Sequence, residues 1–150
     1  MARDRPVRAG HPTYGEWADV LRENGYEPLP IAPRQKRPTP TRWPSVTIDT
    51  AQVAAWQREF PDRGIGLRTG RLVGIDIDIL DPDLAHRVEA LARQRFGDTL
   101  CRVGQWPKRV LLYRTEAPFG KMTAGKVEVL GQGQQVLAFG IHPDTGQQYY

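Results

Sequence analysis

The sequence predicts an α+β fold with a mixed or antiparallel sheet and helices on one side of it. Segments with strand-like patterning outnumber helical ones, several of them are separated only by short turns, and helices are interspersed among them. The chain has 150 residues, 39% hydrophobic residues and four tryptophans, which is enough apolar material for one core. We expect one domain over residues 13–150, preceded by a flexible polar tail over residues 1–12.

Helices are predicted where apolar residues at helical spacing follow a capping residue. Such segments run from Thr13 or Tyr14 to Gly25, over Ala51–Phe60, and over residues 83–96. Asp49 or Thr50 caps the second helix, and the third begins at Asp81-Pro82-Asp83. The residues expected to face the core are Trp17, Val20, Leu21, Val53, Trp56, Leu84, Val88, Leu91 and Ala92.

Strands are predicted where apolar and β-branched residues alternate between turn signals. These segments are Tyr26–Ile31, Ile65–Arg68, Leu72–Ile79, Leu100–Val103, Arg109–Arg114, Lys126–Leu130 and Gln134–Gly140. The prolines of the first segment favour an edge position. A hairpin-like turn is expected at residues 69–71, and Gly131-Gln132-Gly133 predicts that the last two strands pair with each other.

The predicted strand Leu72–Ile79 places two acids on one face. Residues two apart in a strand point the same way, so its isoleucines are expected to face a core while Asp76 and Asp78 share the opposite face. Two neighbouring carboxylates repel each other unless a cation or a proton lies between them, and Mg²⁺ prefers such oxygen ligands. The pattern therefore predicts a divalent metal site. A half-exposed strand with two solvated acids is the alternative.

Glu128 repeats this pattern, because it lies between two valines in Val127-Glu128-Val129. Alone it would be interpreted as a solvent-facing strand acid. Together with Asp76 and Asp78 it gives three carboxylates on neighbouring strands, which can hold one or two divalent ions. In phosphoryl transfer, two metal ions about 4 Å apart stabilise the attacking and leaving oxygens.

Two segments near these acids in the sequence contain groups suited to phosphates. Residues 64–70 combine three glycines with Arg68 and Thr69, and a glycine such as Gly70 lets a ligand approach the backbone closely. An ordinary tight turn is the alternative, since the Gly-Lys-Ser/Thr of a P-loop is missing. Lys108 and Arg109 put two cations at the start of a strand, where they would neutralise a triphosphate or carry solvated surface charge.

Charge and composition limit the choice of partner and compartment. The net charge of +4 and the pI near 9.5 favour a polyanionic partner. Lys36, Arg37 and Arg42 lie in a Pro-rich loop and are candidates for the phosphates of such a partner, with a solvated loop as the alternative. Cys101 is the only cysteine, so no internal disulfide forms. The sequence has no long apolar run and no signal peptide, and we expect a soluble cytoplasmic protein with no membrane partner.

His142 lies in the turn His142-Pro143-Asp144-Thr145-Gly146, where a lone histidine is usually structural or incidental. Trp43 or Trp106 could stack on a base if exposed, and both are core residues in the alternative interpretation, which is the favoured one for Trp43.

Taken in order, several segments resemble the primase–polymerase (Prim-Pol) family. This family is the N-terminal domain of bifunctional DNA primase/polymerases, within the archaeo-eukaryotic primase superfamily, and is carried by phages, plasmids and integrated elements. The likeness extends from about Trp17 to Tyr149, and the ordered series is specific although each part alone is not. The segments are Gly25–Pro30, Lys36-Arg37-Pro38, Trp43, Gly64–Gly70, Gly74–Asp78, Val127–Gly131 and Gly140–Tyr149.

The resemblance implies a fold and a metal site. The fold would be of the primase type, with an RRM-like sheet that holds the acids and an N-terminal α/β module joined to it. Asp76, Asp78 and Glu128 would bind the catalytic metals, Mg²⁺ or Mn²⁺. Many superfamily members also have a Ser-x-His second motif that contacts the incoming triphosphate. Here the corresponding stretch is Pro107-Lys108-Arg109, which lacks the histidine, and Lys108 or Arg109 would replace it.

The resulting hypothesis is template-directed nucleotidyl transfer by a DNA primase/polymerase with a two-metal mechanism, in the replication of a phage, plasmid or integrated element. The expected partners are a DNA template and primer, dNTP or NTP, and a helicase domain or protein. The chain ends at Tyr150, inside or just after the closing motif, so we expect a piece of a longer protein. The residues expected to bind nucleotide are Arg68, Thr69, Gly70, Lys108, Arg109 and His142.

Two other functions were weighed against this hypothesis. One is a non-catalytic, primase-like module that holds nucleotide or single-stranded DNA for a larger replication protein. Retention of all three acids argues against it, because binding alone does not require them. The other is a metal-dependent nuclease, which ranks last because no acid-x-Lys motif follows the acids.

Overall fold

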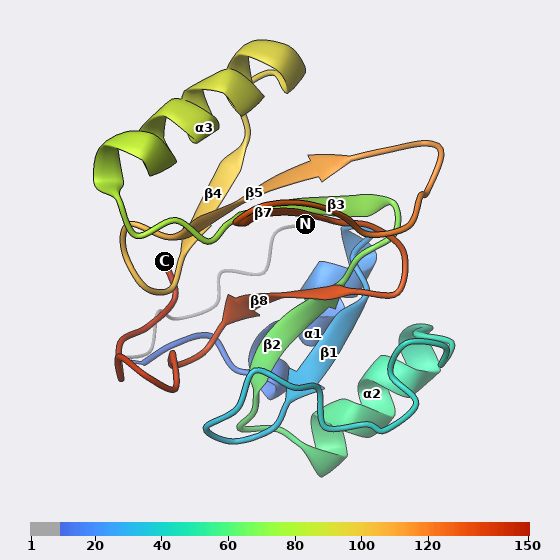
Figure 1. Cartoon of the computed structure of the whole chain (residues 1–150). Helices are drawn as coiled ribbons and strands as arrows, with labels where there is room; N and C mark the ends of the chain where they lie inside the picture. The colour runs from blue at the N-terminus through green and yellow to red at the C-terminus, as the bar shows by residue number, and fades with distance from the viewer. Residues whose placement is uncertain (1–9) are drawn as a thin grey trace.

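Two antiparallel sheets pack against each other in the computed structural model, which describes residues 10–150 (Figure 1). One sheet has three strands in the order β1-β2-β8, and the other has five in the order β4-β5-β3-β7-β6. Helix α3 covers the outer face of the five-stranded sheet, and α1 and α2 lie on the side of the three-stranded sheet (Figure 1). The arrangement confirms the predicted α+β class, and every strand pair is antiparallel.

The element boundaries agree with the predicted ones to within a few residues. The elements are α1 (Tyr14–Glu23), β1 (Pro28–Ile31), α2 (Thr50–Glu59), β2 (Gly64–Arg68), β3 (Leu72–Ile77), α3 (Pro82–Phe96), β4 (Leu100–Val103), β5 (Arg109–Arg114), β6 (Met122–Ala124), β7 (Val127–Leu130) and β8 (Gln135–Phe139).

Each helix begins directly after a capping residue, Thr13, Asp49 or Asp81. The N–H and the hydroxyl of Thr13 both donate to the Glu16 carboxylate at the start of α1, at 3.3 and 3.0 Å. The Asp49 carboxylate accepts from the Gln52 N–H at 2.8 Å, and the Asp81 carboxylate accepts from the Leu84 N–H at 2.9 Å. These bonds satisfy amide groups that have no partner within the helix.

The N-terminal module has its own core between the helices and the three-stranded sheet. Tyr14, Leu29, Val53 and Ile65 are almost fully buried there. The Tyr14 hydroxyl donates to the Pro28 carbonyl at 3.0 Å, so the only polar atom of that side chain is satisfied. This packing fixes the position of the three-stranded sheet.

Strand β3 has two different faces, as the alternating sequence predicts. Ile75 and Ile77 pack with Ala85 and Ala92 of α3. The opposite face, with Gly74 and Asp76, turns toward β8. A Cβ at Gly74 would lie 2.9 Å from Val136 of β8, so this glycine allows the two sheets to approach. Asp76 therefore lies at the layer between the sheets.

Several predictions about pairing and burial are wrong. Strand β8 pairs with β2 and not with β7, because residues 131–134 carry the chain across to the other sheet. The turn at residues 69–71 joins β2 of the three-stranded sheet to β3 of the five-stranded sheet, so it is not a hairpin. Leu84 and Leu91 are 45% and 53% exposed, because α3 meets the sheet through the small side chains of Ala85 and Ala92.

Strand β6 was not predicted and pairs with β7. The predicted flexible tail, residues 1–12, lies mostly outside the described residues. No helix within residues 10–150 is long and apolar enough to cross a membrane.

Candidate nucleotide and metal site

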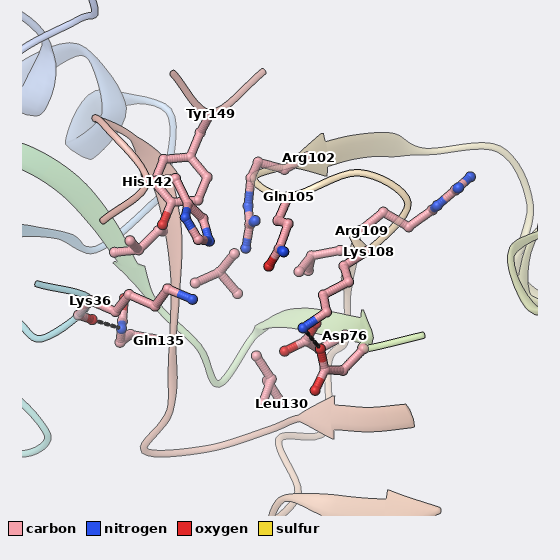
Figure 2. Close-up of a pocket in the computed structure, with 14 residues that line it drawn as sticks. Lys36, Asp76, Arg102, Gln105, Lys108, Arg109, Leu130, Gln135, His142 and Tyr149 are labelled. Carbon is pink, nitrogen blue, oxygen red and sulfur yellow. Dashed lines mark hydrogen bonds and ion pairs between the residues drawn. The ribbon is translucent and has the colours of Figure 1, made fainter. Parts of the chain in front are cut away.

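A polar cavity of about 190 Å³ opens between the two sheets, where the end of β3 meets β8 and the C-terminal segment. Asp76 and Asp78 line one side of it, and the apolar side chains of Val110, Leu130 and Val136 form part of its wall. Figure 2 shows the side chains of Lys36, Arg102, Gln105, His142 and Lys108 directed toward this space. Acidic and basic groups thus face each other across one small volume.

The two acids of the first pattern and the later acid are brought together. Asp76 on β3 is directly opposite Glu128 on β7, and cross-strand neighbours have Cβ atoms about 4.5–5.5 Å apart. Asp78 follows the end of β3, and its N–H donates to the Lys126 carbonyl at 2.9 Å. Glu128 lies beside the cavity and is not part of its lining.

Asp76 is a half-buried carboxylate that lies near two other acids. Burial raises the pKa of Asp76, and the neighbouring charges of Asp78 and Glu128 raise it further, while Arg102 and Lys36 act in the opposite direction. Among the described residues the Asp76 carboxylate has neither a hydrogen bond nor an ion pair, although its backbone pairs within the sheet. A half-buried carboxylate without a partner is unfavourable unless a proton or a cation neutralises it.

Lysines neutralise the other two acids. The Lys108 Nζ lies 2.7 Å from Asp78 Oδ1, and the Lys121 Nζ lies 3.0 Å from Glu128 Oε1. Both pairs are about one-third to one-half exposed, so each is worth little in stability. The lysines can therefore be displaced from the acids without much loss to the fold.

The acids suit a magnesium ion that is shared with a ligand. No three side chains of His, Cys, Asp or Glu converge into a closed metal site in the part of the chain that the structure describes. Mg²⁺ is usually held by one or two carboxylates together with phosphate oxygens of a substrate, and not by an all-protein cage. Asp76, which lacks a partner, and the neighbouring Asp78 and Glu128 provide this kind of open oxygen donor set.

Arg109 contributes little charge to the cavity. Its guanidinium points away from the cavity (Figure 2) and forms an ion pair with Glu89 of α3, with the two side chains 12% and 14% exposed. Glu89 also accepts from Arg93 at 2.8 Å. Burial alone would raise the pKa of Glu89, but the hydrogen bonds from Arg109 and Arg93 outweigh burial and lower it. Arg109 thus ties α3 to β5.

Three predicted nucleotide ligands lie away from the cavity. Arg68 forms a two-pronged ion pair with Glu27 at 2.9 and 3.0 Å and also donates to the carbonyls of Trp43 and Val46. The buried Thr69 donates its hydroxyl to the Gly131 carbonyl at 2.5 Å, and the Gly70 N–H donates to Leu72. Their hydrogen-bonding groups serve the fold, and we leave them out of the proposed site.

His142 is brought into the cavity wall. It is 3% exposed, and its Nδ1 accepts from the N–H groups of Asp144 and Thr145 at 3.2 and 3.3 Å. This arrangement places the ring proton on Nε2. Burial, together with the positive charge of Lys36, lowers the pKa of His142, so the ring is neutral near pH 7 and serves as a hydrogen-bond donor.

The basic loop divides into two parts. Lys36 reaches the mouth of the cavity, whereas Arg37 and Arg42 are exposed and do not line it. Trp106 is 61% exposed, while Trp43 packs against the N-terminal core. Arg37, Arg42 and Trp106 thus remain available to a nucleic acid. The packing of Trp43 agrees with the core position that the sequence analysis favours for it.

Arg102, Gln105 and Tyr149 are cavity residues that the sequence did not single out. One signal was present for Arg102, because a basic residue inside the predicted strand Leu100–Val103 is unusual for an apolar segment. Nothing in the sequence showed that β4 would lie two strands from Asp76, since that placement depends on the sheet order.

Comparison with known protein families identifies a family for this chain. The family model "Bifunctional DNA primase/polymerase, N-terminal" (Prim-Pol) matches residues 18–150. None of the curated proteins compared matches the chain. The match covers most of the sequence and includes every residue of the cavity. The chain belongs to the Prim-Pol family of bifunctional DNA primase/polymerase N-terminal domains.

Proposed function

We propose that this domain catalyses template-directed nucleotidyl transfer, as a DNA primase/polymerase with a two-metal mechanism. The observation that carries the proposal is the position of Asp76, a partly buried carboxylate without a partner among the described residues, directly opposite Glu128 and beside Asp78. Family membership supports the same reaction class. Replication of a phage, plasmid or integrated element is the proposed context, with a DNA template and primer, dNTP or NTP, and a helicase as partners.

Asp76, Asp78 and Glu128 would hold the divalent ions, Mg²⁺ or Mn²⁺. When bound, such ions lower the pKa of an attacking hydroxyl and neutralise charge on a leaving pyrophosphate. The wall of Val110, Leu130 and Val136 behind the acids is apolar and keeps the local dielectric constant low, which strengthens these interactions.

The cationic side of the cavity would bind the nucleotide. Lys108, next to Asp78, is placed to offset phosphate charge at the acids, and the neutral His142 donates a hydrogen bond from Nε2. Lys36 would neutralise charge at the mouth. Arg37 and Arg42 would contact template or primer phosphates from the exposed loop.

A primer-extension assay on this domain tests the proposal. A labelled primer on a DNA template is incubated with each nucleotide set and with Mg²⁺, Mn²⁺ or EDTA. We expect extension that requires both the template and a divalent ion. Binding of nucleotide and single-stranded DNA without any incorporation, under all these conditions, would support the non-catalytic module instead. Loss of labelled DNA ends without extension would support the nuclease.

A further inference from the structure

Arg102 is a cation without a counter-ion at the cavity wall. Its Nε is shielded from solvent and has no hydrogen-bond partner among the described residues. Burial lowers the pKa of Arg102, with Tyr149 and Asp76 acting in the opposite direction, and a guanidinium remains charged near pH 7. Its end points into the space between Gln105 and His142 (Figure 2). An unpaired charge in such a place is costly for a folded protein and is typical of a ligand site.

The C-terminal segment fixes the position of Arg102. The guanidinium lies over the ring of the buried Tyr149, 4.9 Å from its centroid, and the ring of His142 packs on Tyr149 at 5.5 Å. Residue 150 pairs with Val103 of β4 through two backbone hydrogen bonds, at 2.6 and 3.0 Å. A Cβ at Gly104 would lie 2.5 Å from the Tyr149 ring, so this glycine makes room for it.

The register of the five-stranded sheet relates Arg102 to the acids. Arg102 is opposite Val110, Val110 is opposite Asp76, and Asp76 is opposite Glu128, so the four residues form one row across β4, β5, β3 and β7. Strands are spaced about 4.8 Å apart, which puts the backbone at Arg102 about 10 Å from that at Asp76. The residue between them, Val110, is apolar and small.

The cations that line the cavity differ in whether they already have an acidic partner. Lys108 and Arg109 are already paired with Asp78 and Glu89. Arg102 and Lys36 form no ion pair with any described residue, and both lie across the cavity from the acids. A ligand that fits this arrangement carries a chain of negative groups at one end and shares a divalent cation with the acids at the other.

We propose that Arg102, seated on Tyr149, binds the phosphate chain of the incoming nucleoside triphosphate. This inference rests on the proposed function and adds a residue for the phosphate chain of its nucleotide substrate. The guanidinium offers two parallel N–H donors to phosphate oxygens. Tyr149 is a positioning residue, because it holds the guanidinium over the row and makes no ionic contact itself.

The test measures binding without catalysis. Titration calorimetry with dATP and with inorganic tripolyphosphate, each with Mg²⁺ and with EDTA, compares the wild type with Arg102→Met and Arg102→Lys. A charge-assisted contact of this kind is worth a factor of about 10–100 in affinity, so Arg102→Met should lose at least about tenfold for both probes. Arg102→Lys should keep part of the affinity. Arg95→Met removes the same charge from an exposed position on α3 and should bind like the wild type.

Thermal unfolding separates binding from folding. Removal of an unpaired, shielded cation should leave the melting temperature of the free protein unchanged or higher, whereas a purely structural role on Tyr149 predicts that it falls. Tyr149→Leu should weaken binding of both probes, and Tyr149→Phe, which keeps the ring, should restore it.

Several results would overturn the assignment. These are wild-type affinity for tripolyphosphate in Arg102→Met, loss of affinity for dATP alone, and absence of binding by the wild type. Because no outcome depends on incorporation, the inference can fail while primer extension succeeds. It can also hold for a protein that binds nucleotide and does not polymerise.

Discussion

Asp76 and Glu128 lie directly opposite each other on the adjacent strands β3 and β7. Like charges at such positions destabilise a sheet. Lys121 neutralises Glu128, whereas Asp76 has no ionic partner within residues 10–150. The fold therefore carries an electrostatic penalty at Asp76, and a bound cation would remove it.

The first prediction concerns Asp76 and pH. Burial, with the charges of Asp78 and Glu128, raises the folded-state pKa of Asp76. The folded protein thus favours the protonated form, so the penalty is absent below the unfolded pKa of about 3.9 and appears as pH rises through the folded pKa. Asp76→Asn should melt at a higher temperature than the wild type near pH 7, and the difference should shrink toward acid pH.

The matched control for this variant is Asp98→Asn, because the Asp98 side chain is 97% exposed and its ion pair with Arg93, at 3.7 Å, is worth little in stability. Its melting temperature should follow the wild type at every pH. An Asp76→Asn variant that melts below the wild type near pH 7 would show that the carboxylate stabilises the free fold, and the argument for a cation there would be lost.

The second prediction separates Lys108 from Arg109. Arg109 pairs with Glu89 at a mostly buried position, so Arg109→Met should lower the free energy of unfolding by about 1–3 kcal/mol and change the KM for nucleotide little. Lys108→Met should change the free energy of unfolding little and raise the KM for nucleotide. Urea unfolding and steady-state kinetics measure the two effects. A large rise in KM for Arg109→Met in a stable protein would return Arg109 to the nucleotide site.

The same pair has a pH signature. The folded-state pKa of Glu89 is lowered, because hydrogen bonds from Arg109 and Arg93 outweigh burial. The contribution of the ionised Glu89 to the free energy of unfolding is therefore present above the unfolded pKa of about 4.3 and is lost as pH falls through the folded pKa. The stability gap between wild type and Arg109→Met should close in acid, and Glu89→Leu combined with Arg109→Met should recover much of the loss.

The third prediction concerns competition between Lys121 and a metal. Lys121 pairs with Glu128 at 3.0 Å, and a pair this exposed is worth up to about 1 kcal/mol. Lys121→Gln should lower the Mg²⁺ concentration for half-maximal incorporation by up to about fivefold, while Arg95→Gln should leave it unchanged. A higher Mg²⁺ requirement in Lys121→Gln would mean that the lysine assists the site and does not compete.

The fourth prediction concerns DNA. Because the net charge is only +4 and the exposed loop offers Arg37 and Arg42, few phosphates are neutralised at once. The logarithm of the affinity for single-stranded DNA should fall with the logarithm of the salt concentration, with a slope of about −2 to −3. The double variant Arg37→Gln with Arg42→Gln should make this slope less steep by about 1.4. Fluorescence anisotropy measures this. An unchanged slope in the double variant would move the DNA contact elsewhere.

The local parts of the fold could be predicted from the sequence. Thr13, Asp49 and Asp81 fix the helix starts through short-range bonds, and the alternation around Asp76 fixes which face each residue takes. The partner of β8 could not be predicted, because pairing across two sheets depends on long-range packing, and the glycine turn before it fits either choice.

The acids of the candidate site could be predicted from the sequence, but the roles of its basic and aromatic residues could not. The acids follow a local pattern, and the register places them together. Arg68 looked similar to a phosphate ligand, but it satisfies Glu27, a residue 41 positions away in the chain. Arg102 and Tyr149 meet only because the C-terminal segment returns to β4, and no short segment of sequence carries that information.

The most direct test of the central claim is template-directed incorporation of labelled nucleotide by Asp76→Asn and Asp78→Asn, each compared with wild type and Asp98→Asn in Mg²⁺ and in Mn²⁺. A metal ligand contributes several kcal/mol to such a reaction, so each variant should lose at least about 100-fold in rate while its circular dichroism spectrum stays native. Asp98→Asn should keep full activity. Near-normal Mg²⁺-dependent incorporation by either Asp76→Asn or Asp78→Asn would contradict the assignment of these carboxylates to the metal site.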